Sequence, residues 1–161
     1  MLSIMSGASS RKPAWEDKFR RPASAELMAG ITDTTLAQVV VEARGLLSGL
    51  AGMAETVAWQ GLPWRWAFIY RHPATEPVAW AYLIPDPTRP QIAVPLHAPS
   101  IESLGVKRFK RYVREGIARG RPVGETLWTS WDVMSKSQLE EVTELLVRKF
   151  KLTIAPGPDE E

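Results

Sequence analysis

WQGLPWRWAFIY, residues 59–70, is the stretch that decides the fold. It holds three of the seven tryptophans and ends in a strict alternation of side chains. One face of the alternation is formed by Trp64, Trp66, Phe68 and Tyr70. A period of two is typical of a β-strand, here with one large aromatic face. Because Gly61-Leu62-Pro63 has turn composition, we expect the strand to begin after it and to cover residues 64–70.

Hydrophobic periodicity divides the rest of the chain into further elements. Strands are expected over residues 56–60, 78–84, 91–96 and 125–133. Helices are expected over residues 22–29, 35–50, 100–119 and 137–149. In the last helix, Arg148 and Lys149 come late, where the helix dipole favours cations. Successive antiparallel strands with helices on one face predict an α+β two-layer sandwich, with a mainly antiparallel five-stranded sheet and about three packed helices.

The length of 161 residues fits one domain with tails. We expect a tail and a short helix over residues 1–32, a single α+β domain over 33–155, and a disordered acidic tail over 156–161. Trp15 and Phe19 could pack from the first segment onto the domain.

Composition excludes several classes of site and protein. The chain has no cysteine and only two histidines, His72 and His97. Disulfides, thiol catalysis, iron–sulfur clusters and Cys-ligated zinc are therefore excluded, and no metal or other cofactor is expected. No apolar run approaches the ~18 residues of a membrane span, and residues 1–13 lack the apolar core of a secretory signal. The expected location is the cytoplasm, without membrane association.

Three short motifs follow one another in the order of these elements. They are ETVAWQGLP at residues 55–63, AYLIP at 81–85 and a Ser-capped helix at 137–149. Over roughly residues 33–152 this pattern resembles the YdhG-like group of small bacterial domains of unknown function. The resemblance implies a small α/β sandwich, usually without an assigned activity, and some members have been likened to frataxin as iron chaperones.

Iron handling is one hypothesis that follows from the resemblance. It would need an acidic ridge, and the densest acidic cluster here is Glu140, Glu141 and Glu144. Three carboxylates early in a helix are also what an ordinary capped helix shows.

The aromatic residues of the sheet are the favoured functional site. The candidate ligand-binding residues are Trp59, Trp64, Trp66, Tyr70, Trp80 and Tyr82. Cross-strand aromatic pairs stabilise a sheet by about 0.2–1 kcal/mol each, so core packing is one explanation. A face left uncovered would instead bind a small apolar or aromatic ligand, or a partner such as a second copy in a homodimer. Trp128 and Trp131 could both join it only through a bulge, since their spacing of three puts them on opposite faces.

A basic segment, residues 107–121, is the alternative site. It carries seven Lys or Arg against one Glu, although the whole chain has a net charge of only +2. The candidate polyanion-binding residues are Lys107, Arg108, Lys110, Arg111 and Arg114. Such a segment would hold nucleic acid with a steep salt dependence, or an acidic protein. A solvated helix face, whose long stems cover apolar surface, explains the same pattern.

No catalytic signature stands out, so the expectation leans away from an enzyme. His97 lies close to Ser100, but the GxSxG elbow is missing. Asp86 and Asp132 lie at strand ends, where turn and cap preferences explain them. The chain also lacks a Walker A loop and a GxGxxG motif, so nucleotide binding by those routes is not expected.

Overall fold

A computed structural model describes residues 12–154 of the chain. Its six strands are β1 (Ala54–Trp59), β2 (Trp66–Arg71), β3 (Ala81–Ile84), β4 (Gln91–His97), β5 (Arg121–Val123) and β6 (Thr126–Asp132). Its α-helices are α2 (Ser24–Ala29), α3 (Thr34–Gly49), α4 (Arg111–Ala118) and α5 (Lys136–Thr153). Short 3₁₀ segments are η1 (Ala14–Glu16), η2 (Pro73–Thr75), η3 (Ala98–Leu104) and η4 (Val106–Arg108). Residues 1–11 of the expected N-terminal segment and the tail expected over residues 156–161 lie outside the described residues.

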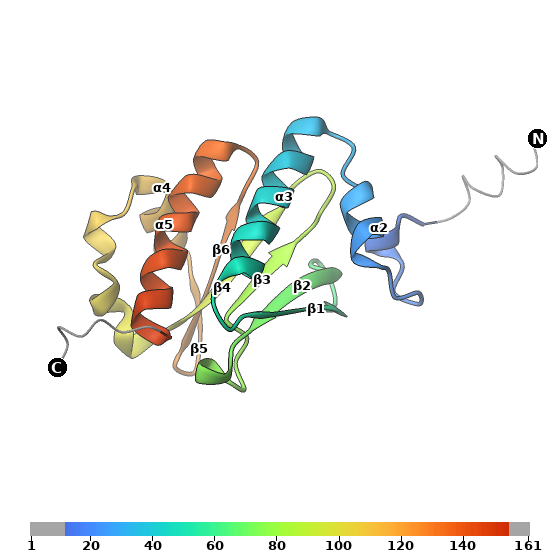
Figure 1. Ribbon diagram of the computed structural model, residues 1–161. Helices are drawn as coiled ribbons and strands as arrows, with labels where there is room; N and C mark the ends of the chain where they lie inside the picture. The colour runs from blue at the N-terminus through green and yellow to red at the C-terminus, as the bar shows by residue number, and fades with distance from the viewer. Residues whose placement is uncertain (1–11, 155–161) are drawn as a thin grey trace, which may run out of the picture.

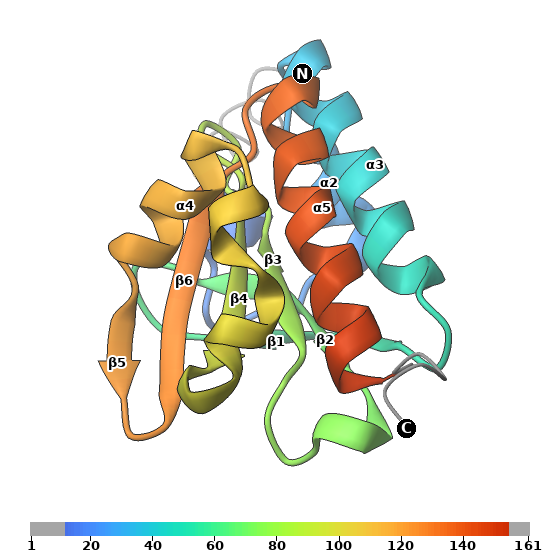
Figure 2. The same ribbon diagram turned by 90° about the vertical axis from the view of Figure 1, so that its left-hand side faces the viewer.

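The sheet is antiparallel throughout, with the strand order β1-β2-β3-β4-β6-β5. Helices α3, α4 and α5 lie on one side of it, with α3 and α5 next to each other (Figures 1 and 2). The α+β class and the antiparallel sheet are therefore confirmed. The expected five strands are six, because the short β5 pairs with β6 at the edge, and there are more helical segments than three.

The prediction of one continuous helix over residues 100–119 is wrong. The structure breaks it into η3, η4 and α4. Gly105 ends η3 with a φ of 66°, in the left-handed region that glycine enters without strain. Phe109 and Lys110 are then extended before α4 begins. The basic segment is consequently spread over η4, α4 and β5 instead of one helix face.

Strand β2 separates two environments. Phe68 faces α3, where the Arg44 guanidinium lies 4.8 Å from the centre of its ring. Tyr70, on the same face, donates from Oη to Glu55 Oε2 at 2.8 Å. Ile69 points the other way and pairs in register with Tyr82 of β3. The helix-covered face of the sheet thus holds the residues of β2 at even positions.

Helix α5 begins as the sequence predicts. The Ser135 side chain accepts a hydrogen bond from the Gln138 backbone N–H at 3.1 Å, which caps the first turn. Its buried stripe is Leu139, Val142, Leu145, Leu146 and Lys149. The face that packs on the sheet therefore ends in a charged residue. Among the described helices, none has the length and apolar character needed to cross a bilayer.

Candidate functional site

Lys149 is the one charged side chain that is buried within residues 12–154, with 6% of its surface exposed. Helical periodicity places it there, three residues after Leu146 on the apolar stripe of α5. Its Nζ donates to the Trp80 carbonyl at 2.6 Å and to the Pro95 carbonyl at 2.7 Å. Trp80 directly precedes β3, and Pro95 lies within β4. Lys149 thus joins the end of α5 to two neighbouring strands.

The charge of Lys149 has no ionic partner in the described part of the chain, where every ion pair within 4.0 Å involves other residues. The centre of the Trp80 ring lies 4.8 Å from Nζ. Burial lowers the pKa of Lys149 to about 7, because removal from water disfavours the ammonium. An ammonium has three N–H groups, and the two carbonyls take two of them. Within the described residues, the third N–H has no hydrogen-bond acceptor beside these two carbonyls.

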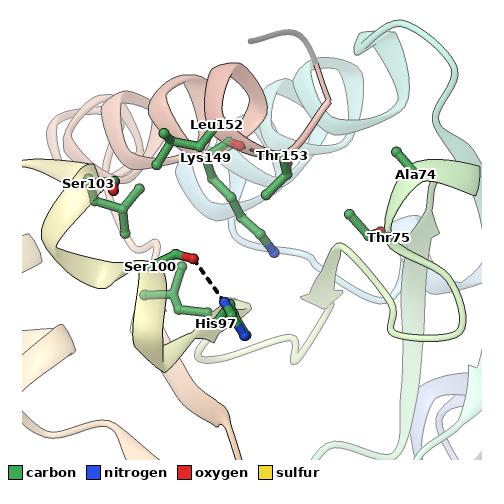
Figure 3. A pocket seen from close by; sticks show the side chains of 10 residues that line it. Ala74, Thr75, His97, Ser100, Ser103, Lys149, Leu152 and Thr153 are labelled. Carbon is green, nitrogen blue, oxygen red and sulfur yellow. Dashed lines mark hydrogen bonds between the residues drawn. The ribbon is translucent and has the colours of Figure 1, made fainter. Parts of the chain in front are cut away.

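A cavity of about 330 Å³ lies beside Lys149. It is lined by η2, the end of β4, η3 and the last turn of α5, and the lysine side chain extends from α5 toward it (Figure 3). Leu96, Leu104 and Leu152 supply apolar wall, while hydroxyl side chains come from Thr75, Ser100, Ser103 and Thr153. A second cavity of about 210 Å³ shares Lys149 and His97 with it. A mainly apolar hollow with a few convergent polar groups is typical of a small-molecule site.

His97 and Ser100 line this cavity, and Glu125 lies beside His97. His97 Nδ1 is 2.8 Å from Ser100 Oγ, and His97 Nε2 is 3.8 Å from Glu125 Oε2. All three side chains are exposed. The first distance is a hydrogen bond, whereas the second is an ion-pair contact that forms when the imidazole is protonated.

The structure does not bring the six candidate ligand-binding aromatic residues together on one face. Trp66 and Tyr70 are buried on the helix-covered face, with Trp59 packed edge-on against Trp66 at 5.7 Å. Tyr82 lies on the opposite face, in contact with Trp64 at 5.2 Å. Trp64 leaves the expected alternation because Arg65, with a φ of 60°, precedes the first residue of β2. The single aromatic face predicted for Trp64, Trp66, Tyr70, Trp80 and Tyr82 does not form.

Trp80 is the member of that set that contacts Lys149. It precedes β3, is fully buried, and donates from Nε1 to Thr153 Oγ1 at 3.0 Å. Its carbonyl and its ring both contact Lys149. Trp128 and Trp131 fall on opposite faces of β6, since Trp128 contacts Tyr82 at 5.8 Å while the Trp131 indole donates to Tyr112 of α4.

The five expected polyanion-binding residues, Lys107, Arg108, Lys110, Arg111 and Arg114, are all exposed on η4, α4 and the link between them. Only Arg111 has an ion-pair partner in the described residues, Glu115 at 3.4 Å. The expected acidic cluster lies on α5, where Glu144 pairs with Arg148 at 3.8 Å. Residues 12–154 contain no group of three or more His, Asp or Glu arranged to hold a metal ion.

Lys149 is the site residue that sequence reasoning missed. A lysine in the last turns of a helix is explained by the preference of the helix dipole for cations, so the residue type alone does not indicate a buried site. The available signal was its position, because residues 142, 146 and 149 share one side of a helix. Glu125 was missed for another reason: it meets His97 only through the pairing of β6 with β4, which joins segments far apart in sequence.

The chain was compared with protein-family models and with curated proteins. No family model matches it, and no curated protein matches it. The resemblance to the YdhG-like group accordingly stays a prediction.

Proposed function

We propose that the protein binds a small molecule with an apolar body and a carboxylate group in the cavity beside Lys149. The observation that carries the proposal is a buried lysine, without an ionic partner in residues 12–154, at an apolar hollow. Burying an unpaired charge is unfavourable, and an opposite charge within hydrogen-bond distance offsets much of that penalty. A carboxylate would accept the third N–H of Lys149, and Leu96, Leu104 and Leu152 would contact the apolar body.

The cavity volume limits the size of the ligand. About 330 Å³ corresponds to roughly eleven water molecules at ~30 Å³ each. A monocarboxylic acid of about ten non-hydrogen atoms would fill it. The proposal keeps the class of small apolar ligand that the aromatic sequence pattern favours, but it moves the site from the sheet face to Trp80 and Lys149.

Hexanoate and hexanamide test this proposal, because they match in shape and differ in charge. We expect hexanoate to bind at pH 6.5 at least tenfold more tightly than hexanamide, measured by calorimetry and by Trp emission. Since Trp80 contacts Lys149, its emission is expected to change on binding. Hexanoate affinity should fall as the pH rises above about 7, where Lys149 loses its charge.

The variant Lys149→Met should lose at least tenfold of the hexanoate affinity. Lys151→Met is the matched control, since Lys151 lies on the same helix and is exposed. Equal binding of hexanoate and hexanamide to the unaltered protein would contradict the proposal, as would full affinity in Lys149→Met.

A second function is supported by the basic segment. We propose that Lys107, Arg108, Lys110 and Arg114 contact the phosphates of a nucleic acid, because all four are exposed and have no ion pair within the described residues. Four phosphate contacts predict that affinity for duplex DNA falls by about two orders of magnitude between 50 and 200 mM salt. Filter binding across that range measures the slope. Replacing Arg108 and Lys110 with alanine should make the dependence of affinity on salt less steep. Lys136→Ala on α5 should leave that dependence unchanged. An affinity that does not depend on salt would contradict this proposal.

A further inference from the structure

We propose that Ser100, His97 and Glu125 hydrolyse small carboxylic esters at the Lys149 cavity. The inference rests on the proposed function, because the acid released would be the carboxylate that Lys149 holds. The Ser100 hydroxyl contacts the His97 imidazole, which contacts the Glu125 carboxylate. These groups can act as the nucleophile, the base and the group that favours the charged base. The distances are 2.8 Å from Ser100 Oγ to His97 Nδ1 and 3.8 Å from His97 Nε2 to Glu125 Oε2.

The sheet itself brings these residues together. His97 is the last residue of β4 and pairs in register with Thr126 of β6, next to Glu125. Gly124, with a φ of 60°, makes the tight turn between β5 and β6 that places Glu125 there. The Ala98 backbone N–H donates to the Glu125 carbonyl at 2.7 Å, which fixes the two chain segments to each other. Ser100 follows His97 by three residues, in η3.

The cavity gives the ester a place beside the nucleophile. His97, Ser100 and Lys149 all line it, and Ser100 and His97 face each other on the wall across from the α5 segment (Figure 3). The acyl chain would lie against Leu104 and Leu152. The Lys149 ammonium is a cation in the same cavity, so it favours the negative charge that develops on the ester carbonyl oxygen.

The reaction proceeds in two displacement steps without any oxidation or reduction. In the tautomer that carries its proton on Nε2, His97 Nδ1 takes the proton of the Ser100 hydroxyl as Oγ attacks the carbonyl carbon. The bond to the alkoxy oxygen breaks, and the alcohol leaves with the proton from His97. Water then attacks the acyl group on Ser100, its proton passing through His97 to Oγ as the acyl bond breaks. One ester and one water give one alcohol and one carboxylic acid.

Glu125 is a positioning residue in this scheme, since it acts through His97. Its carboxylate favours the imidazolium that forms in both steps, and its effect is moderate because both side chains are exposed. The Ser100–His97 bond could instead only stabilise the start of η3. In that case Ser100 would be no more reactive than any other serine, which a covalent probe can decide.

The first test is to treat the full chain with a fluorophosphonate that carries a hexyl chain. We expect one adduct, located on Ser100 by peptide mass spectrometry, and its loss when His97 is replaced by Asn. We also expect hydrolysis of p-nitrophenyl hexanoate to fall about 100-fold in Ser100→Ala. Ser137→Ala, an exposed position on α5, should keep the rate and the labelling. Glu125→Gln should move the pH profile of hydrolysis while leaving the adduct on Ser100.

The outcomes separate this inference from the proposed function. An adduct absent from Ser100, or an unchanged rate in Ser100→Ala, overturns the hydrolysis. If hexanoate still binds in that event, the binding function stands alone. An adduct on Ser100 without any hexanoate binding to the unaltered protein supports the hydrolysis and overturns the proposed binding function.

Discussion

Replacing Gly116 with alanine is expected to destabilise the protein by about 2 kcal/mol, although alanine is the better helix former. Gly116 lies in α4 where the helix meets β6. A Cβ there would overlap Nε1 and Cε2 of the Trp131 indole. Trp131 is 1% exposed and donates from Nε1 to the Tyr112 carbonyl at 3.1 Å, so it has no free space to enter. The expected loss combines displacement of the indole with weakening of that hydrogen bond.

Urea unfolding of Gly116→Ala measures this effect, and the chain offers a matched control. Gly45 lies in α3, and a Cβ added there would meet nothing within 4 Å. Gly45→Ala should therefore stabilise the protein by up to ~1 kcal/mol. In a Trp131→Phe background the loss caused by Gly116→Ala should shrink, because the smaller ring leaves room. A neutral Gly116→Ala would contradict the close approach of α4 to β6.

Gly116 also shows what the sequence could predict. In the sequence, Gly116 only lowers the helix propensity of its segment. In the structure, the absence of a side chain there lets α4 pack against Trp131. Leu104, Phe109 and Val113 belong to the apolar pattern of the expected 100–119 helix, and all three are buried. Periodicity predicts which side chains point inward but not whether the backbone between them is continuous. The left-handed Gly105 interrupts it here.

Alternation of side chains also predicts the positions of the strands. It predicts only in part which face of the sheet each side chain occupies. Alternation located β2, β3, β4 and β6 to within a few residues. The face of each aromatic side chain depends on where regular alternation begins. Arg65, with its positive φ, and Trp80, which precedes β3, both lie just outside their strands. The edge strand β5 has only three residues, one of them Pro122, so no periodicity could mark it.

The candidate site could be predicted least well, because it depends on contacts between distant segments. His97 and Ser100 are close in sequence, so the sequence alone shows that they are neighbours. Glu125 joins them through the pairing of β4 with β6, and Lys149 through the packing of α5 on the sheet. A single sequence does not state such pairings. The candidate site is therefore assembled by strand pairing and helix packing together.

The stability of the unaltered protein is expected to rise with pH relative to Lys149→Met, by about 1.4 kcal/mol per pH unit between pH 7 and 10. Burial lowers the folded-state pKa of Lys149 to about 7 from an ordinary value of 10.5. Between these values the unfolded chain binds a proton at Lys149 and the folded chain does not. Because the unfolded state then holds more protons, raising the pH favours folding. Below about pH 7 both states are protonated, and the difference between the two proteins stops changing.

Urea unfolding of both proteins at pH 6, 7, 8, 9 and 10 gives this difference directly. Lys149→Met leaves the Trp80 and Pro95 carbonyls without their donor, which lowers its stability by an amount that does not depend on pH. Only the slope therefore reports the titration of Lys149. Lys151→Met, an exposed lysine two residues further along α5, should keep the slope of the unaltered protein. A pH-independent difference for Lys149→Met would mean that the two carbonyls hold Lys149 fully charged. The cavity would then present a permanent cation, and hexanoate affinity should no longer fall above pH 7.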